Sequence, residues 1–316
     1  MFDLLIKGAH VVDPLNHVNG KADVAVKDGK IAAVGRDLPE DAKEIVDFSG
    51  YVLQPGIIDS HVHLGSMWGS PYGARMLAMK GVTTCLDMAG PLEDILDKVP
   101  EYGAGINMAI LQFASPPFTF KNDHPTKSEM EALIDKSLDD GALGVKLLGG
   151  HYPLKPDVSS LLIKTALERR AYVAWHAGTS EHGSNIEGMQ EAVAMADGYP
   201  LHLAHINAYC RGAIKNELEE VAIAIDLLKK NPNIFCESYI SPKNGTRLTC
   251  DETGKIQSKV TGNCLRKFGF SEDRDGVKKA ILAGKAFVVY DAGGYSDLMT
   301  GEEALKLWED AGTNVG

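Results

Sequence analysis

Two histidines separated by one residue close a short apolar run early in the chain. His61 and His63 follow Ile57-Ile58-Asp59-Ser60, with Val62 between them. Alternate side chains of a β-strand share a face, so both imidazoles project the same way and Val62 projects the other way. Neutral imidazole is the commonest protein ligand of zinc and similar ions. The pair is therefore either half of a metal site or two hydrogen-bonded core histidines.

Three more polar groups lie in or just after later apolar runs. His176 ends Ala171-Tyr172-Val173-Ala174-Trp175, His205 follows Leu201-His202-Leu203-Ala204, and Lys146 stands within Leu143 to Leu148. A lone ammonium in an apolar strand is costly to bury unless it is neutralised, is coordinated or reaches water. Four imidazoles suit one or two divalent ions, with Zn favoured and Fe, Mn or Co as alternatives. Such ions would support metal-assisted hydrolysis.

The rhythm of the sequence changes near residue 53, which predicts two domains. Residues 1–53 alternate β-type runs with turns and predict a small β-sandwich-like module. Lys27-Asp28-Gly29-Lys30 predicts a two-residue hairpin within it, because Asp-Gly accepts the positive φ values of a type I′ turn. Residues 54–316 instead alternate buried strands with amphipathic helices roughly every 25 to 35 residues, which is typical of βα units around a parallel sheet.

The pattern of residues 54–316 predicts an α/β fold of the TIM (β/α)8-barrel type. In such a barrel, functional side chains gather at the carboxyl ends of the strands. No Gly-rich phosphate loop supports an open doubly wound sheet. Residues 243–275 break the rhythm and predict an irregular surface excursion, a candidate lid. One helix should begin with one of the overlapping capping boxes in Thr126 to Glu131, and the pair of Ser128 and Glu131 is favoured. The strand candidates are residues 57–60, 82–88, 106–113, 143–148, 172–176, 201–206, 234–239 and 287–290.

The composition is that of a globular protein and excludes several classes of partner. The 316 residues are 44% hydrophobic and 24% charged, which is enough for a large core, and the net charge of -11 argues against nucleic acids and anionic membranes. The first residues show no secretory signal, and no apolar run could span a bilayer, so a cytoplasmic location is expected. Five scattered cysteines without CxxC spacing indicate neither a disulfide framework nor a thiolate zinc site.

These motifs resemble the amidohydrolase superfamily of metal-dependent hydrolases. The resemblance rests on the run from Pro55 to His63, on Gly81-Val82-Thr83-Thr84, on the strand lysine, and on single histidines that end the fifth and sixth strands. It implies that His61 and His63 bind one metal ion and that His176 and His205 bind another. It also implies that Lys146, carboxylated by CO2, bridges the two ions, which would turn a buried cation into an anionic ligand.

Within the superfamily the sequence is most similar to N-acyl-D-amino acid deacylases, dihydroorotases and hydantoinases. This similarity implies that a metal-bridging hydroxide cleaves a non-peptide amide C–N bond in a small, carboxylate-bearing substrate. Tyr152 is a candidate oxyanion donor, with an aromatic packed under the next loop as the alternative. Arg211 is a candidate for binding the substrate carboxylate, with a solvated loop arginine as the alternative. His202 is expected to pack or to form hydrogen bonds rather than to bind metal.

The resemblance weakens toward the last residues. The family has an acid/base aspartate after strand eight, and Asp291 is the positional candidate, although it lacks the usual Ser or Thr neighbour. Alternatively the chain is shorter than its relatives and the barrel is incomplete. A homo-oligomer or a completing partner chain is then expected, because open strand edges invite association. Three functions stay open: an N-acyl amino acid deacylase, a cyclic-amide hydrolase, and a non-catalytic homologue that serves as an assembly subunit.

Overall fold

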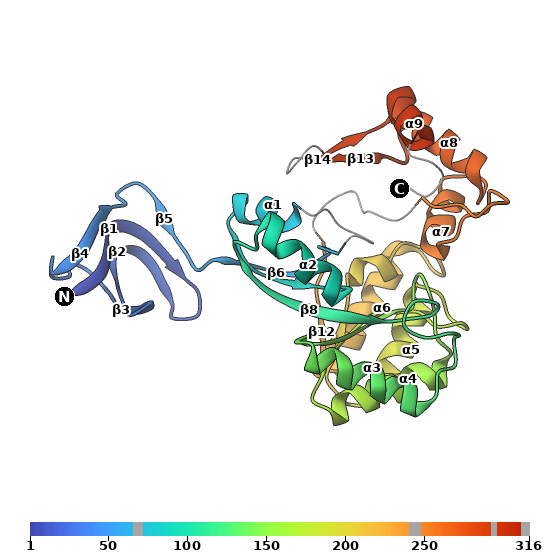
Figure 1. Ribbon diagram of the computed structural model, residues 1–316, viewed down its shortest axis with the longest axis horizontal. Helices are drawn as coiled ribbons and strands as arrows, with labels where there is room; N and C mark the ends of the chain where they lie inside the picture. Colours follow the sequence, from blue (N-terminus) through green and yellow to red (C-terminus); the bar gives the residue numbers. More distant parts are fainter. Residues whose placement is uncertain (66–71, 240–247, 292–295, 311–316) are drawn as a thin grey trace. The chain divides into compact units, whose positions relative to one another are not determined.

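The computed structural model describes residues 1–65, 72–239, 248–291 and 296–310 (Figure 1). The chain divides into two compact units, Met1–Ile57 and Ile58–Gly316. The sequence predicted a division after residue 53. No helix within the described ranges is long and apolar enough to cross a membrane.

The first unit is one five-stranded mixed sheet in which β1 pairs with β2, β4 and β5. Asp28 and Gly29 have φ values of +51° and +72°, and they join β2 to β3 as the predicted hairpin. The register of β1 shifts at Gly8, whose φ is +71°, and such a bulge bends a strand. This bend lets β1 pair with β4 before it and with β5 after it, so the described strands of this unit form one mixed sheet. The strands are β1 (Phe2–Asp13), β2 (Val18–Lys27), β3 (Lys30–Gly35), β4 (Ala42–Asp47) and β5 (Val52–Leu53).

The second unit is built on a seven-stranded parallel sheet whose strands follow one another in chain order, from β6 at one edge to β12 at the other. This arrangement confirms the α/β class and the alternation of strands and helices. The strands are β6 (Ile57–Val62), β7 (Val82–Asp87), β8 (Asn107–Ala114), β9 (Gly144–Leu148), β10 (Tyr172–His176), β11 (Leu201–Leu203) and β12 (Ile234–Cys236). The intervening helices are α1 (Gly73–Met79), α2 (Leu92–Tyr102), α3 (Lys127–Asp139), α4 (Pro156–Glu168), α5 (Ile186–Ala196), the 3-10 helix η1 (Ile206–Tyr209) and α6 (Glu217–Lys230).

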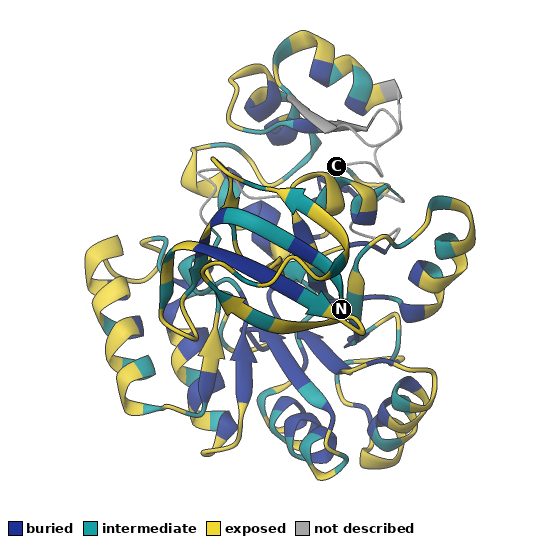
Figure 2. Cartoon of the chain, turned by 90° about the vertical axis from the view of Figure 1, so that its left-hand side faces the viewer, coloured by how far each residue is buried: buried dark blue, intermediate teal, exposed yellow. Residues whose placement is uncertain are grey.

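The pleat of the central strands separates an apolar outer face from a polar inner face. Leu147 and Trp175 belong to the cluster that packs the sheet against α3, α4 and α5, whereas Lys146 and His176 project to the other side. Figure 2 shows buried strands and helices that expose their outward faces. Each large apolar side chain buried in this way contributes roughly 1.5–3 kcal/mol to folding. The outer face therefore stabilises the sheet while the inner face carries the polar groups.

Capping explains where one of these helices begins. The hydroxyl of Thr126 accepts a hydrogen bond from the backbone N–H of Glu129, and the Glu129 carboxylate accepts from the backbone N–H of Thr126. The capping box at Ser128 and Glu131 was therefore the wrong choice. Thr126 is in the extended conformation that an N-cap requires, whereas Ser128 already lies inside the helix.

The predicted eighth strand does not join the parallel sheet. β13 (Val288–Asp291) pairs antiparallel with β14 (Ser296–Met299) instead. Among the strands that the structure describes, β6 and β12 are the two edges, and they do not pair with each other. A four-residue apolar run predicts a strand but not its partner, which is why the sequence pattern misplaced it. The described fold is thus an open, seven-stranded part of a barrel.

The C-terminal residues have a core of their own. β13 and β14 pack with α7 (Lys259–Lys267), α8 (Arg274–Leu282) and α9 (Gly301–Asp310). The segment 243–275 was predicted to be irregular, but α7 and the start of α8 lie in it, and residues 243–247 are outside the described ranges. Ser258 caps α7, and Val260 and Leu265 are buried, so the polar composition concealed a helix with an apolar side. The buried members of this core are Leu248, Cys250, Ile256, Leu265, Val277, Ala280, Ile281, Val288, Ala304 and Trp308.

Candidate metal centre

The four histidines predicted from strand ends meet at one end of the sheet. His61 lies on β6 and His63 just after it, while His176 ends β10 and His205 follows β11. The ring centroid of His61 lies 5.2 Å from that of His63 and 5.2 Å from that of His205. The rings of His176 and His205 are 4.3 Å apart. Strands far apart in sequence therefore bring the four imidazoles together.

Lys146 lies at the centre of β9 and is almost completely buried, with 1% of its surface exposed. Its Nζ donates to the sulfur of Met88 at 3.4 Å. Burial lowers the pKa of Lys146 to about 7, although Glu237 and Asp87 attract the charged form. A large share of these amines is unprotonated near neutral pH, and only an unprotonated amine can react with CO2. We call His61, His63, Lys146, His176 and His205 the rim site.

The rim histidines are held in the form that binds cations. Burial, and then the neighbouring His205 and His151, lower the pKa of His176 well below its ordinary value. Burial, and then Lys146 and His61, do the same for His205. The Nδ1 of His205 is buried without a hydrogen-bond partner among the described residues, and the Nε2 of His176 lies 2.8 Å from the Ser184 hydroxyl. Neutral imidazoles with an orphaned buried nitrogen fit a divalent ion.

The spacing of the rim site is looser than that of a closed coordination shell. In the part of the chain that the structure describes, one trio has all its ligand atoms within 4.8 Å of one another, namely Glu181, His182 and Glu191. We call these three residues the loop trio. Glu181 is exposed, and the other two are partly exposed. The rim imidazoles are thus gathered at one place but would have to move closer together to share an ion.

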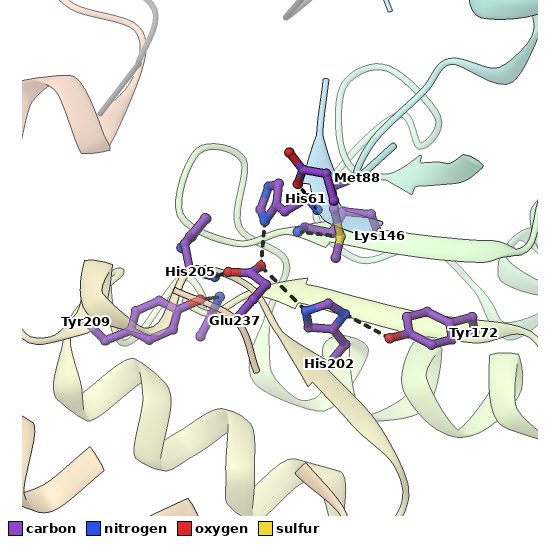
Figure 3. A network of polar contacts seen from close by, with 10 residues as sticks. His61, Met88, Lys146, Tyr172, His202, His205, Tyr209 and Glu237 are labelled. Atoms are coloured by element: carbon purple, nitrogen blue, oxygen red, sulfur yellow. Dashed lines mark hydrogen bonds and ion pairs between the residues drawn. The ribbon is translucent and has the colours of Figure 1, made fainter. Parts of the chain in front are cut away.

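Glu237 is a member of this region that the strand-end histidines did not reveal. It follows β12, and its Oε1 lies 2.6 Å from the Nδ1 of His61, while its Oε2 accepts from the backbone N–H of His205 at 2.5 Å (Figure 3). Burial alone would raise the pKa of Glu237, but contacts with His202 and His61 outweigh it and hold that pKa well below its usual range. The sequence signal that could have identified Glu237 is its place as a charged residue directly after the run Ile234-Phe235-Cys236.

Asp87 is a second carboxylate next to the rim site that sequence reasoning missed. It ends β7 with no exposed surface, and it accepts backbone N–H bonds from Leu64 at 2.5 Å, from Ala89 at 3.0 Å and from Gly90 at 2.6 Å. Burial raises the pKa of Asp87, although these three N–H bonds oppose the rise. Since Leu64 directly follows His63, Asp87 fixes the backbone on which His63 stands. The sequence signal that could have identified Asp87 is again its position at the end of an apolar run.

His202 forms hydrogen bonds, as expected. Its Nδ1 lies 2.8 Å from the hydroxyl of Tyr172, and its Nε2 lies 3.5 Å from the Oε1 of Glu237. The first distance is a full hydrogen bond, whereas the second is long enough that electrostatic attraction accounts for it better. His202 therefore lies beneath the rim site, on the inner face of the sheet.

The two candidate substrate contacts differ in their surroundings. The Tyr152 ring packs at a right angle on Phe118, with centroids 5.0 Å apart, and joins a small apolar cluster, so the structure favours the packing alternative. Arg211 donates to the hydroxyl of Tyr239 at 2.9 Å and points a second nitrogen at the Cys264 sulfur, 3.8 Å away. Both substrate roles remain predictions.

Asp291, the candidate acid/base, is described only in its backbone. It ends β13 opposite Ser296, in the hairpin and not in the parallel sheet. Its side chain lies outside the described residues, so its role stays a prediction.

The C-terminal core reaches the rim site through α7. The hydroxyl of Ser258, the N-cap of α7, lies 2.9 Å from the Nδ1 of His151. The ring of His151 is in turn 5.1 Å from that of His176. At the other end of α7, Lys267 donates to the backbone oxygen of Arg211 at 2.7 Å. One helix therefore contacts loops that follow both β9 and β11.

Two solved structures share this fold at low sequence identity. The N-acyl-D-glutamate deacylase of Bordetella bronchiseptica, solved with zinc and a phosphonate mimic of the tetrahedral intermediate, is 18% identical with a TM-score of 0.62, and the match covers 89% of this chain and 74% of that one. A D-hydantoinase is 19% identical with a TM-score of 0.55, over 90% of this chain and 67% of that one. At such identities the likeness concerns the fold alone.

Sequence comparison gives a short match and a long one. An allantoinase of Escherichia coli O1:K1 / APEC is 46% identical over 92 residues, which is 28% of this chain and 20% of the allantoinase. The chain thus matches only about a fifth of the length of that relative. The profile of the amidohydrolase family matches residues 52–302, which is most of the chain. The chain therefore belongs to the amidohydrolase family.

Proposed function

We propose that this protein is a metal-dependent hydrolase that cleaves a non-peptide amide C–N bond in a small, carboxylate-bearing substrate, as N-acyl amino acid deacylases do. The observation that carries the proposal is the meeting of four imidazoles and a buried amine at the carboxyl end of a parallel sheet. Active sites of barrel enzymes lie at this end. Family membership and the fold shared with the deacylase support the same class.

The family resemblance divides the rim histidines into two ligand pairs. His61 and His63 would hold one divalent ion, His176 and His205 would hold a second, and Lys146, once carboxylated, would lie between them. Zinc is the favoured ion for such nitrogen ligands. When bound, these ions acidify a water molecule and polarise the amide carbonyl. The protein's own part is to keep the imidazoles neutral by burial and to fix their orientation.

Arg211 is the proposed partner of the substrate carboxylate. Its contacts are a phenol and a thiol, and no carboxylate of the described residues lies within ion-pair distance of it. A guanidinium placed in this way can still form two parallel hydrogen bonds with an incoming carboxylate. Tyr152 remains the weaker candidate, because its ring already packs against Phe118.

Two alternatives have observations in their favour. The allantoinase match and the D-hydantoinase fold favour a cyclic-amide hydrolase. The edges β6 and β12, unpaired with each other among the described strands, favour a chain that associates with a second copy or a completing partner. A non-catalytic assembly subunit would use the same edges.

The deciding experiment measures bound metal and bond cleavage on the purified 316-residue chain. We expect one to two zinc ions per chain and release of free amino acid from N-acyl-D-amino acids. Ring opening of hydantoins without deacylation would instead select the cyclic-amide hydrolase. Bound metal without cleavage of either substrate class would select the assembly subunit, and failure to bind metal would contradict the proposal.

Two variants sharpen this experiment. His176→Ala combined with His205→Ala should remove one of the two proposed ions and abolish cleavage if these residues are ligands. Asp291→Ala tests the remaining acid/base candidate. Cleavage lost with metal retained would assign that role to Asp291, whereas unchanged cleavage would remove it from the site.

A further inference from the structure

The proposed ligands that have to meet come from strands at or near the two edges of the open sheet. His61 lies on the edge strand β6, and His205 follows β11, the neighbour of the other edge β12. Backbone pairing between β6 and β12 is absent from the described residues. Without another contact between these two strands, the edges of the open sheet can move apart and separate the two ligand pairs. Glu237 provides such a contact.

One carboxylate oxygen of Glu237 faces the edge strand β6, and the other faces the residue that follows β11. Oε1 lies 2.6 Å from the Nδ1 of His61 on β6, and Oε2 accepts from the backbone N–H of His205 at 2.5 Å. The side chains of Glu237 and His61 expose only 17% and 16% of their surface, so water competes weakly for these contacts. One side chain thus joins strands that share no backbone hydrogen bond.

The contact with His205 also holds an unusual backbone conformation. His205 has φ +38° and ψ +63°, in the left-handed region that residues other than glycine enter at a cost of about 1–3 kcal/mol. Its N–H points to Glu237 in this conformation. A charge-assisted hydrogen bond offsets a cost of this size. Glu237 therefore fixes the backbone of His205 as well as the ring of His61.

Glu237 is itself held by contacts with residues on the inner face of the sheet. The Nε2 of His202, which is 6% exposed, lies 3.5 Å from its Oε1, and the Nδ1 of His202 contacts the Tyr172 hydroxyl at 2.8 Å. Figure 3 shows this continuous line of polar groups from Tyr172 through His202 and Glu237 to His61. Tyr172 and His202 stand on β10 and β11, so the carboxylate is also tied to the two strands next to the edge strand β12.

We propose that Glu237 is a positioning residue that fastens the first strand of the open sheet to the last, with His202 and Tyr172 as its anchor. The inference rests on the proposed function for the identity of the ligands, and it adds a residue that acts through them without binding the ion. Carboxylates that orient ligating histidines change metal affinity about 10–100-fold when they are removed. Removing Glu237 should therefore weaken metal binding and loosen both edges.

The first test needs no metal. Hydrogen exchange is measured by mass spectrometry on the full chain in chelator, for the wild type, Glu237→Gln and Glu237→Ala. We expect faster exchange in peptides that cover His61 and His205. Glu220→Gln is the matched control, because the Glu220 carboxylate is buried and also accepts backbone N–H bonds, from Gly212, Ile214 and Lys215. Unchanged exchange at the rim in both Glu237 variants would overturn the proposal.

The second test measures zinc affinity by competition with a chromophoric chelator. We expect affinity to fall about 10–100-fold in Glu237→Gln and Glu237→Ala, less in Tyr172→Phe, and not at all in Glu220→Gln. X-ray absorption on zinc-saturated Glu237→Gln should show the same number of ligands as the wild type. Loss of one oxygen ligand would overturn the proposal, since Glu237 would then bind the ion itself, and so would wild-type affinity in both Glu237 variants. If the wild type binds no zinc, the proposed function fails while hydrogen exchange still decides on Glu237.

Discussion

The rim site and the loop trio place metal-binding side chains in opposite environments. Glu181, His182 and Glu191 have the tighter spacing but lie on partly exposed surface. The Glu191 carboxylate, which accepts from the His182 ring, raises the pKa of His182 and so favours the imidazolium that cannot bind a cation. Burial lowers the pKa of His176 and His205, which favours neutral imidazole. Environment therefore distinguishes the two groups better than the distance between ligand atoms does.

The largest expected effect follows from removing ligands at the rim. His61→Ala combined with His63→Ala deletes one proposed ligand pair, so we expect zinc affinity to fall more than about 100-fold, beyond the loss that an orienting residue causes. Glu191→Ala, the matched change in the loop trio, should leave affinity unchanged. Elemental analysis of dialysed protein measures both. Zinc lost from Glu191→Ala but retained by the double variant would reverse the comparison.

Lys146→Met tests how much the buried amine of Lys146 lowers the free energy of unfolding. In chelator, replacing the buried amine by an apolar side chain of similar length should raise the free energy of unfolding at pH 7 by roughly 1–3 kcal/mol. The pKa of Lys146 is about 7 in the folded chain, below the value near 10.4 that unfolded chains have, so the unfolded state binds more protons between these values. Wild-type stability then rises with pH across this window.

The difference between Lys146→Met and the wild type should accordingly shrink as the pH rises from about 7 to 9.5. Urea unfolding at both pH values measures it. Equal differences at the two values would show that the amine is not neutralised by burial.

Gly150→Ala tests the packing around one rim imidazole. A Cβ on Gly150 would lie 1.9 Å from the Nε2 of His176, so the ring has to move. We expect zinc affinity to fall about tenfold, within the range seen when a ligand loses its orientation. Gly20→Ala is the control, because a Cβ there meets nothing within 4 Å. Competition titration distinguishes the two, and equal affinities would mean that His176 is not needed in its present position.

The smallest effect belongs to the loop trio. The raised pKa of His182 means that its pair with Glu191 stabilises the fold below the unfolded pKa near 6.5, and that this contribution is lost as the pH rises through the folded value. Since His182 is well exposed, the contribution should be under about 1 kcal/mol. Glu191→Gln should lower the pKa of His182 in an NMR titration and reduce stability at pH 5.5 but not at pH 8. An unchanged titration would show that the pair does not form in solution.

The sequence predicted the elements that local rules determine. Asp28 and Gly29 form the expected turn because only a few residue types accept their φ values. The expectation that functional side chains follow the carboxyl ends of strands located the four rim histidines, because parallel strands share one carboxyl end. The fold class and the family followed from the same patterns.

What the sequence missed depends on partners chosen by tertiary structure. The run at residues 287–290 is a strand, but its pairing with β14 was not encoded in its own periodicity. Glu237 and Asp87 end strands as the histidines do, yet carboxylates are so common at loop starts that position alone did not single them out. Ser258 and the helix that it caps were hidden by a polar composition.

The contacts between α7 and the loops at the rim are polar: Ser258 with His151, Lys267 with Arg211, and the exposed pair of Lys267 and Glu217. Water can replace the exposed contacts of Lys267 at little net cost, whereas Ser258 is only 3% exposed and water replaces its contact less readily. Movement of a small molecule past this helix would therefore break polar contacts and leave the two adjoining apolar cores packed.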